Sequence, residues 1–499
     1  MKLPASYYNL VSYIGATIAS ISFSLIIFML IITSIMDQAN SYVGIVIFLI
    51  LPSLLVMGLI LIPLGMWLKI RKVKREKGVL SESRLILNLN DKRHRTAALI
   101  FLIGTFFFVL FTGIGSYELY HYSESVEFCG TVCHEAMKPE YVAYQNSAHA
   151  RVTCAQCHIG SGAEWFVKAK ISGMYQVYSV LTNKVPRPIP TPIENLRPAR
   201  ETCEKCHWPE KFYANSLHNE KYYLTDEANT EWEIQLRMKT SPEHSSKGQQ
   251  EGIHWHINPN VQIDYIASDK KREVIPWVRY INKVTGDTVI YHDQNEPLEE
   301  AGVDTLPMRL MDCMDCHNRP AHNYQTPSTF VNHSIASGDV STELPEIKRL
   351  AMEIFAAKYS NTDTALLAIE KTVWKFYMEN YPEIISEKEN LLKQAIKGLQ
   401  KGFEQNIFPE MNANWDAYPD HIGHMEFNGC FRCHNNQHQA ESGKVISNDC
   451  NLCHNIMLQG NSDSTYVAKF NENLEFIHPV DIDEAWKESN CSDCHRSLY

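Results

Sequence analysis

Cysteines in closely spaced pairs constrain this 499-residue chain more than any other feature of its sequence. Seven pairs account for all 14 cysteines, and a histidine directly follows each pair. They are Cys129/Cys133 with His134, Cys154/Cys157 with His158, Cys203/Cys206 with His207, Cys313/Cys316 with His317, Cys430/Cys433 with His434, Cys450/Cys453 with His454, and Cys491/Cys494 with His495. Six pairs have the spacing C-x-x-C-H, and the first pair is one residue longer.

This spacing suits the covalent attachment of haem. Two cysteines three positions apart can each form a thioether with one vinyl group of the same haem, and the adjacent histidine can bind the iron as proximal ligand. A disulfide framework would not require a histidine after each pair, and zinc ribbons do not repeat that histidine seven times. The sequence therefore predicts a multihaem cytochrome with seven covalently bound haem c groups.

The other histidines are candidates for the second axial position of each iron. Of 21 histidines, seven follow the cysteine pairs and His94 lies in a basic loop near the N-terminus, which leaves 13. In an extended His-x-His pair the two rings point apart, so we do not expect His254 and His256 to reach one iron. The candidate ligands are His149, His218, His254, His256, His322, His424, His438 and His478. We interpret five others as non-ligands: His121, His244, His292, His333 and His421.

The first pair has a second possible ligand nearby. Met137 follows His134 by three residues, and a thioether ligand would raise the reduction potential relative to two imidazoles. The spacing is equally typical of a core methionine, so whether His134 or Met137 binds the first haem stays open.

Three apolar stretches near the N-terminus, at about 11–35, 43–68 and 97–117, are long enough to cross a bilayer as helices. The loop 69–95 contains ten lysines and arginines, whereas the link between the first two stretches contains none. Because positive loops stay in the cytoplasm, we expect this loop inside and the haem part outside, on the periplasmic side of a bacterial inner membrane. The first stretch lacks a small-residue cleavage site, so we interpret it as an uncleaved anchor.

The outer part of the chain is acidic. Residues 118–499 carry 35 basic and 53 acidic residues, a net charge of −18. This argues against nucleic acid as a partner. It fits a soluble redox partner with a basic docking face, such as a periplasmic cytochrome or reductase, although acidity also promotes solubility.

The predicted fold is mainly α, with little regular structure around the haems and with two inserts. Residues 272–293 indicate a hairpin, 222–239 look strand-like, and 343–408 look helical with a break at Pro382. Two haem clusters bridged by the fourth haem are expected. The predicted domains are a membrane domain (1–117), a haem domain with motifs one to three (118–210), a β-rich insert with motif four (211–325), a helical insert (326–415) and a triple-haem segment (416–499).

The segment 97–207 contains the span that ends at Tyr117, followed by the runs FCGTVCHEAMKPEY, YQNSAH, CAQCHIG, WFVKAK and ETCEKCHWP, in that order. With these runs the segment resembles the NapC/NirT family of membrane-anchored multihaem quinol dehydrogenases. The chain departs from the family's usual pattern in having three spans instead of one and seven haem motifs instead of four or five. In addition, no acidic residue lies between Trp165 and Lys184, where some members place a carboxylate beside the first haem.

The resemblance implies oxidation of menaquinol or ubiquinol at the outer membrane face, beside the first haem. It implies Met137 as axial ligand of that haem, His149 as a distal ligand of another, and Lys168 or Lys170 as the lysine near the quinol. Quinol oxidation releases two protons with two electrons, so it needs a nearby base or hydrogen-bond partner. An alternative of equal weight is that the side chain of either lysine extends to the lipid headgroups and has no part in quinol oxidation.

The sequence is therefore consistent with three alternative functions. The first is an inner-membrane quinol dehydrogenase, with menaquinol as the expected donor, in anaerobic or extracellular respiration. The second is an electron-relay and anchor subunit of a larger respiratory complex, which does not itself oxidise quinol. The third is a terminal multihaem reductase, which needs an iron with an open coordination position.

Overall fold

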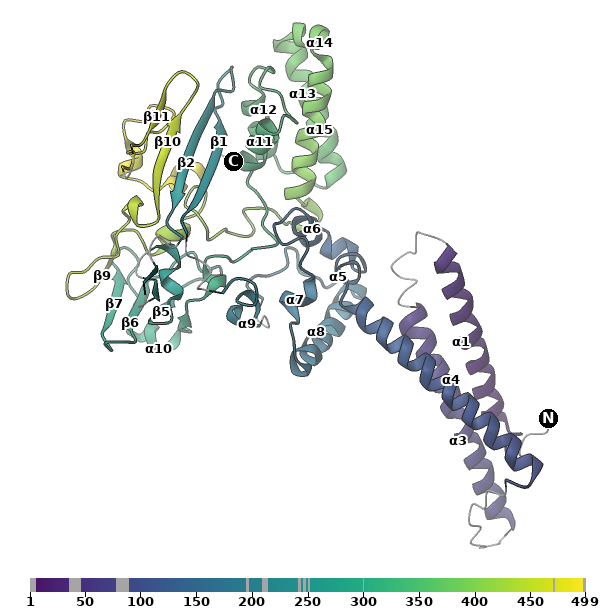
Figure 1. Ribbon diagram of the computed structural model, residues 1–499. Coiled ribbons are helices and arrows are strands. Elements are labelled where there is room, and N and C mark those ends of the chain that lie inside the picture. Colours follow the sequence, from purple (N-terminus) through teal and green to yellow (C-terminus); the bar gives the residue numbers. More distant parts are fainter. Residues whose placement is uncertain are drawn as a thin grey trace. The chain divides into compact units, whose positions relative to one another are not determined.

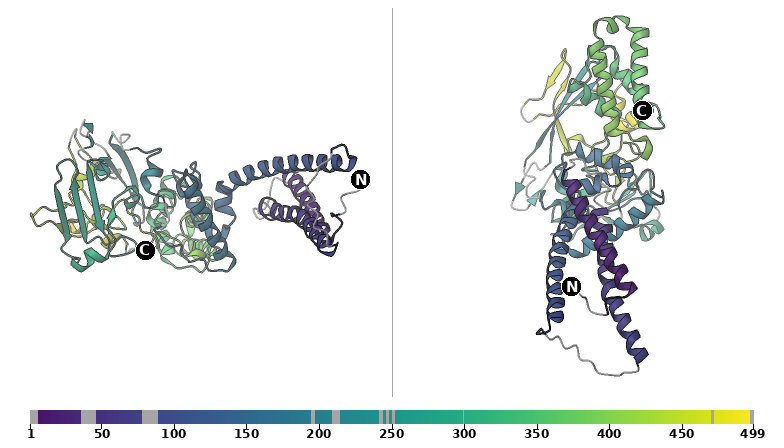
Figure 2. Two further views of the ribbon diagram at one scale, coloured as in Figure 1. Left: turned by 90° about the horizontal axis from the view of Figure 1, so that it is seen from below. Right: turned by 90° about the vertical axis from the view of Figure 1, so that its right-hand side faces the viewer.

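The computed structural model describes residues 6–35, 46–77, 89–193, 197–208, 214–240, 244–245, 248–249, 252–298, 300–469 and 472–496. They form two compact units, 1–134 and 135–499, which are described separately. Figures 1 and 2 show the elements in chain order. Residues 43–45 of the second predicted span and 78–88 of the basic loop lie outside the described residues.

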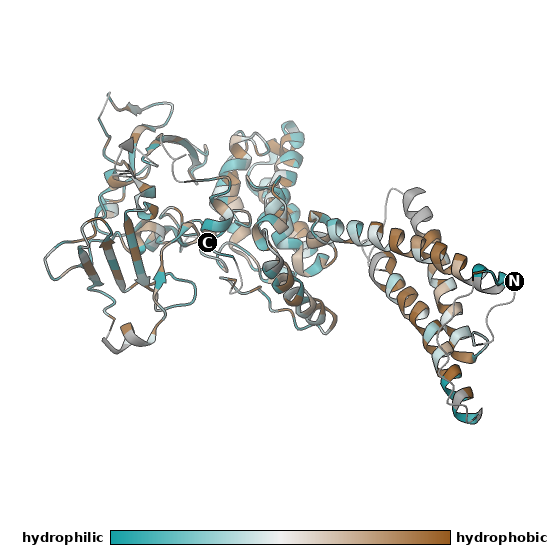
Figure 3. Cartoon of the chain, turned by 60° about the horizontal axis from the view of Figure 1, so that its bottom comes forward, coloured by the Kyte–Doolittle hydropathy of each residue, from teal (hydrophilic) through white to brown (hydrophobic). Residues whose placement is uncertain are grey.

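Long apolar helices dominate the first unit: α1 (Leu10–Ile35), α3 (Leu51–Lys77), preceded by a short π-helix (Val46–Ile50), and α4 (Lys92–Ser123). Their most apolar segments are Leu10–Met29, Leu51–Val73 and Ala98–Ser123, each long enough to cross a membrane. Brown, apolar colour follows these helices in Figure 3. The prediction of three apolar N-terminal helices is confirmed.

Small residues allow α1 and α3 to approach closely. A Cβ atom on Gly15 would lie 2.7 Å from the carbonyl oxygen of Gly58, and one on Gly58 would lie 2.7 Å from the backbone nitrogen of Ala19. The buried Ser12 hydroxyl donates to the Ile62 carbonyl at 2.9 Å. Helices in lipid gain little from apolar burial against each other, so such contacts between small and polar groups hold them together.

Two antiparallel sheets organise the second unit. The first has the order β1-β2-β10-β11 and the second the order β8-β5-β6-β7-β9, and strands from the C-terminal segment complete both. The bounds are β1 Ser216–Tyr223, β2 Glu231–Met238, β10 His454–Gly460, β11 Thr465–Val467, β5 Val261–Ile266, β6 Trp277–Asn282, β7 Thr288–Asp293, β8 Arg309–Leu310 and β9 His438–Gln439, with a separate pair β3 (His244–Ser245) and β4 (Gly248–Gln249). The predicted hairpin is confirmed as β6 and β7.

The helical insert contains α11 (Pro327–Ala336), α12 (Ile347–Ala356), α13 (Thr362–Asn380), α14 (Pro382–Glu387) and α15 (Glu389–Asn406). They pack around one apolar core, in which the rings of Phe355 and Phe403 stack with centroids 6.3 Å apart. The predicted break at Pro382 is confirmed, because proline begins α14 at a position where its missing N–H is not needed.

Short helical turns carry the haem motifs between these elements: α5 (Val126–Thr131), α6 (His134–Gln145), α7 (Cys154–His158), α9 (Ala199–Cys203), α16 (Cys491–His495) and 3-10 turns at Cys313–Asp315, Gly429–Arg432 and Cys450–Leu452. The remaining helices are α8 (Ala163–Leu181), α10 (Glu300–Thr305) and 3-10 turns at Ile253–Ile257, Pro409–Met411 and Ala485–Lys487. The fold is therefore helical with small antiparallel sheets.

Lys348, in α12, is a buried cation in the helical insert. Its side chain is almost inaccessible, and Nζ donates to the Ser328 carbonyl at 3.0 Å. Burial lowers the pKa of Lys348 to about 7 from an ordinary 10.5. Between about pH 7 and pH 10.5 Lys348 is protonated in the unfolded chain but mostly neutral in the folded chain. The free energy of unfolding of the insert therefore rises with pH in this range.

We predict that replacing Lys348 by Met stabilises the insert at pH 7 and removes this pH dependence. From pH 7 to pH 9 the wild-type free energy of unfolding should gain about 2 kcal/mol that the variant does not gain. Thermal unfolding followed by circular dichroism at both pH values measures the difference. The exposed Lys375→Met serves as control, and equal pH dependence in both variants would contradict the assignment.

Candidate haem sites

In most motifs one short helical turn brings the two cysteines and the histidine together. In the first motif Cys129 lies in α5 and His134 begins α6, and in the sixth His454 begins β10. In motifs three to five the histidine N–H donates to the carbonyl of the first cysteine, at 2.8 Å for His207 and His317 and 3.1 Å for His434. All 14 cysteines lie in the described part of the chain, and none of them forms a disulfide. In most motifs the local geometry thus presents two sulfur atoms and one imidazole from a single turn.

The predicted attachment cysteines differ in how far they are exposed. Cys206, Cys450 and Cys494 are exposed, whereas the other 11 are partly buried. The spacing of the motifs did not distinguish these three positions, because exposure is set by the packing around each turn. An exposed sulfur can still form a thioether with a vinyl group. Cys494, on α16, therefore stays a predicted attachment site, but its side chain lies at the surface and not in an enclosed pocket.

Six motif histidines face a second histidine ring. The ring centroids are separated by 6.1 Å for His207–His149, 6.2 Å for His158–His322, 6.4 Å for His317–His254, 5.9 Å for His434–His256, 6.3 Å for His454–His424 and 6.2 Å for His495–His478. Each pair joins one motif histidine with one histidine from elsewhere in the chain.

These separations match two imidazoles that share a metal ion. An imidazole nitrogen lies about 2 Å from a bound metal ion and roughly 1 Å from its own ring centre, so rings on opposite sides of one ion have centres about 6 Å apart. Aromatic rings in direct contact also have centroids about 4.5–7 Å apart, so the distance alone does not carry the argument. Its weight comes from the pattern, because each of the six pairs joins one motif histidine to one other histidine. The residues present therefore fit the haem that the cysteine spacing implies.

Backbone carbonyls orient most of the non-motif rings. The Nδ1 atoms of these rings lie at hydrogen-bond distance from carbonyl oxygens: His149 from Pro320 (3.1 Å), His254 from Thr240 (3.0 Å), His256 from Ile253 (2.7 Å), His322 from Glu140 (3.0 Å) and His478 from Val480 (2.7 Å). A carbonyl can only accept, so the proton is on Nδ1 and the Nε2 lone pair is available to a metal.

The pair His424–His454 differs from the others. Both Nδ1 atoms are buried, and within the described part of the chain neither has a hydrogen-bond partner. Burial lowers the pKa of both rings, that of His454 to about 4. They are therefore neutral imidazoles that lack the carbonyl contact made by the other non-motif rings.

The same effect keeps other paired rings neutral. Burial lowers the pKa of His158, His317, His322 and His434, and that of His256 to about 4. Neutral imidazole is the form that binds a metal ion.

Two candidate ligands lie elsewhere. Nε2 of His218, on β1, is 2.7 Å from the Glu220 carboxylate. His438 is fully buried, with Nε2 2.7 Å from the Ile275 carbonyl and Nδ1 2.9 Å from the Asn435 side-chain oxygen. Among the described residues, neither ring faces a motif histidine. His438 instead joins the end of the second sheet to its neighbouring loop.

In the first motif, α5 carries Cys129 and is capped by Ser125, whose hydroxyl accepts from the Phe128 N–H at 3.0 Å. His134 is the last residue of the first unit and begins α6, and Met137 lies three residues further along that helix. This geometry does not decide whether His134 or Met137 binds the first haem.

Motifs two to seven follow one another in space as they do in the chain. Their cysteines are within electrostatic or hydrogen-bonding range in the pairs Cys157–Cys206, Cys203–Cys313, Cys316–Cys430, Cys430–Cys453 and Cys450–Cys491. The cysteines of motifs two to seven thus lie in one series, with motif four between motifs three and five. The expectation of two haem clusters bridged by the fourth haem stays a prediction.

Comparison with known proteins decides the family. Residues 91–189 match the N-terminal region of the NapC/NirT cytochrome c family. A curated relative from Geobacter sulfurreducens, "Cytochrome c-type protein ImcH", is 40% identical over 501 residues, which cover 99% of this chain and 96% of the relative. The chain belongs to the NapC/NirT cytochrome c family. No solved structure matches it.

Membership establishes a membrane-associated, multihaem c-type cytochrome that takes part in electron transport, with covalently bound haem c. The three apolar helices of this NapC/NirT cytochrome agree with a membrane location.

A buried ion pair supports one paired histidine of the cytochrome. Nη2 of Arg319 lies 3.1 Å from the Glu140 carboxylate, and its guanidinium lies 4.1 Å from the ring centroid of Tyr418. The Glu140 carbonyl accepts from His322. Sequence reasoning did not identify Glu140 or Arg319, although Glu140 lies in the run that carries the family resemblance.

The two predicted quinol-site lysines lie on α8. Nζ of Lys168 is 2.7 Å from the Glu164 carboxylate and 4.8 Å from the ring centroid of Trp165. Nζ of Lys170 lies 5.0 Å from the Phe166 ring centroid. Glu164 is a carboxylate that the sequence reasoning overlooked, because it precedes the apolar run by one residue.

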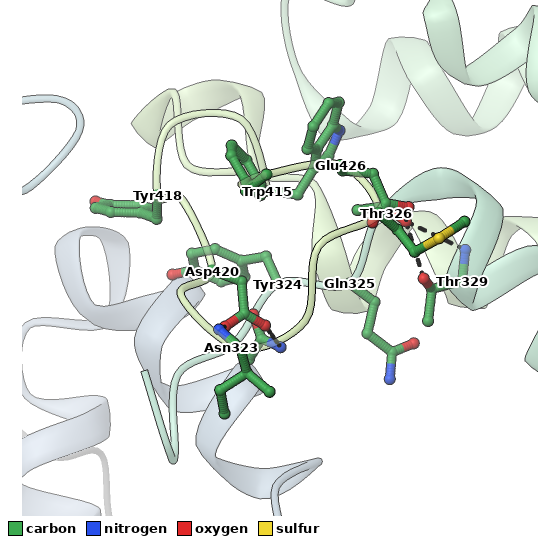
Figure 4. A pocket seen from close by; sticks show the side chains of 12 residues that line it. Asn323, Tyr324, Gln325, Thr326, Thr329, Trp415, Tyr418, Asp420 and Glu426 are labelled. Carbon is green, nitrogen blue, oxygen red and sulfur yellow. Dashed lines mark hydrogen bonds between the residues drawn. The ribbon is translucent and has the colours of Figure 1, made fainter. Parts of the chain in front are cut away.

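A cavity of about 150 Å³ lies beside Tyr324 and Tyr418. Figure 4 shows its polar wall, where Asn323 donates to Asp420 and Thr326 to Glu426. Its lining includes no motif cysteine and no paired histidine, so we assign it no part in the haem sites.

Proposed function

We propose that this NapC/NirT cytochrome is an inner-membrane heptahaem protein that takes electrons from quinol, with menaquinol as the expected donor. It passes them through its haems to periplasmic acceptors in anaerobic or extracellular respiration. Haem c supplies reversible one-electron chemistry when bound. The chain's own residues attach each group, orient its axial ligands and exclude water from them.

The observation that carries this proposal is the set of six facing histidine pairs. In our assignment the motif histidines are proximal ligands and His149, His254, His256, His322, His424 and His478 are distal ligands. Both axial positions are then filled at six sites, which suits electron transfer. It disfavours the terminal-reductase alternative, because substrate chemistry needs an open position.

Electron entry is proposed at the first motif. Cys129 follows the last residue of α4, Ser123, by six positions, so this site is tethered close to the end of the third apolar helix. Excess positive charge in the loop 69–95 supports a cytoplasmic loop and a periplasmic haem part.

The exposed face of α8 supports a quinol site on this helix. Ile171, Met174, Tyr175 and Leu181 are all exposed, so the helix presents a large apolar surface beyond its two lysines. An apolar quinol can approach such a surface, and the Glu164–Lys168 pair offers groups that can accept hydrogen bonds or protons as the quinol is oxidised.

One observation favours the relay-subunit alternative. No residue of the apolar segment Ala98–Ser123 is buried within the described structure, and the closely packed α1–α3 pair exceeds what a single-anchor cytochrome needs. Such helices can serve to anchor partner subunits, in which case another protein would oxidise the quinol.

The quinol step is tested on the purified full-length protein in detergent. Intact mass should exceed that of the chain by seven haems, and a menaquinol analogue should reduce the protein. Lys168→Met should slow the reduction about tenfold or more, as expected when a group active in proton transfer is lost. Lys393→Met is the matched control, because it removes another exposed lysine paired with a glutamate one turn away (Glu389, 2.8 Å).

A protein with seven haems that no quinol analogue reduces would contradict the entry step and favour the relay subunit. Equal rates for both lysine variants would remove Lys168 from the quinol site. A haem count below seven would contradict the assignment of haem to every motif.

The sixth site should have the highest reduction potential of the six histidine pairs. A hydrogen bond from Nδ1 makes an imidazole a stronger donor, which stabilises oxidised iron. His424 and His454 both lack that bond within the described part of the chain. In a spectroelectrochemical titration, His424→Ala should remove the highest-potential component assigned to a histidine pair, whereas His322→Ala should remove a lower one. Loss of a low-potential component from His424→Ala would contradict this ranking.

A further inference from the structure

We propose that the fourth and fifth haem sites form one rigid pair, joined by the guanidinium of Arg432 on one side and by the segment 254–256 on the other. Arg432 is a positioning residue that also raises the reduction potential of both sites. The inference rests on the proposed function, because it requires haem at both motifs.

A single short turn supplies the facing ring of both sites. In the 3-10 turn Ile253–Ile257, His254 faces the fourth motif through His317 and His256 faces the fifth through His434. Only one residue separates the two rings in the chain. A movement of this turn therefore displaces both rings together.

Trp255 anchors the turn between them. Its ring stacks on Tyr280 of β6 at 5.5 Å and 25°, beside the apolar core of the second sheet. The Ile253 N–H donates to the Lys239 carbonyl at 2.8 Å, which ties the start of the turn to the end of β2. The two rings are thus held against a sheet and not on a free loop.

On the other side, Arg432 joins the two haem-attachment loops. It lies inside the fifth motif, between Cys430 and Cys433. Its Nε, Nη1 and Nη2 donate to the carbonyls of Gly429 (2.7 Å), Arg272 (2.8 Å) and Asp315 (2.8 Å). Asp315 occupies the same position within the fourth motif, so one side chain directly connects the interiors of both motifs.

The loop that Arg432 contacts is itself firmly held. The Asp315 carboxylate is almost fully buried and accepts from the Tyr265 hydroxyl (2.7 Å), from Arg272 Nη1 (2.9 Å) and from Arg309 Nε (2.5 Å). Charged hydrogen bonds of this kind are stronger than neutral ones. Arg432 therefore ties the fifth motif to a fixed point.

The three hydrogen-bond partners of Arg432 are carbonyls, so its positive charge is not neutralised by a carboxylate in that contact. The charge acts on Cys316 of the fourth motif and on Cys430 and Cys433 of the fifth. A positive charge in a partly buried position favours the state with the extra electron. It therefore raises the reduction potential of both sites.

Rigidity and charge act on the same electron-transfer step. One electron leaves the fourth site, which is oxidised, and arrives at the fifth site, which is reduced, and no bond or proton needs to move. Fixed groups around both sites limit the reorganisation that accompanies this transfer.

Two substitutions in the full-length holoprotein separate these effects. Arg432→Gln removes both the charge and the three-way contact, whereas Arg432→Lys keeps the charge but cannot span three carbonyls. Arg349→Gln, in the helical insert far from any motif in the sequence, is the control. Spectroelectrochemistry reports the potentials, and hydrogen exchange reports the mobility of loops 312–317 and 429–434.

We expect Arg432→Gln to lower the potentials of two haem components and to speed exchange in both loops by about tenfold or more. Arg432→Lys should speed exchange similarly but keep the potentials close to wild type. Unchanged exchange in Arg432→Gln, a shift of one component only, or wild-type behaviour of Arg432→Lys in exchange would overturn the inference.

A third variant tests the proposal if the arginine variants fold too poorly to be purified. Trp255→Leu should loosen the turn and alter the spectra of two haem components together, and alteration of one component only would overturn the pairing. Failure of the proposed function is recognised separately on the unaltered protein, which would then carry fewer than seven haems or would carry seven and not be reduced by a menaquinol analogue.

Discussion

The structure of the second unit depends on neutral imidazole rings held opposite one another at the separation that a shared metal ion requires. An imidazole can ligate only through an unprotonated nitrogen, and burial together with Nδ1–carbonyl contacts provides that form. The two sheets, the short turns and the loops between them supply these rings from distant parts of the chain. His322 reaches the second motif from beyond the fourth, and His424 reaches the sixth from before the fifth.

The charged groups around these rings are few and firmly bonded. Glu140 and Arg319 form a buried ion pair next to His322, and Arg432 connects two motif loops through carbonyl oxygens. Removing one partner of the Glu140–Arg319 pair would leave the other charge buried and unpaired, which is strongly destabilising. The helical insert, in contrast, is held by an apolar core of its own.

Local sequence patterns predicted local structure well. Hydropathy predicted the three apolar helices, alternation predicted the β6–β7 hairpin, and Pro382 predicted the break between α13 and α14. The facing rings were harder to predict, because a ligand's partner is set by tertiary packing and not by distance along the chain. His438 seemed suitable because it lies near the fifth motif, yet both of its ring nitrogens bond to neighbouring loops. We expected His254 and His256 to be separated because their segment would be extended, whereas they lie in a 3-10 turn. The two rings do face different motifs, but their assignment to consecutive motifs was not predicted.

Local spacing also could not predict which cysteines are exposed or which residues make long-range contacts, because tertiary packing sets both. The seven motifs look alike in the sequence, yet Cys494 lies exposed at the last motif while Cys433 is partly buried at the fifth. Arg432 was overlooked because nothing in its local spacing signals a contact between motifs. Glu164 was overlooked because it lies just before the apolar run, although its spacing of four residues from Lys168 is typical of an ion pair on one helix face.

The central claim is that six sites are closed by two histidines and that the first site is different. Low-temperature electron paramagnetic resonance, combined with near-infrared magnetic circular dichroism of the fully oxidised full-length protein, tests it most directly. The account predicts low-spin signals for six irons with two imidazole ligands and a distinct signal for the seventh. High-spin signals from two or more irons, or fewer than six irons with two imidazole ligands, would contradict it.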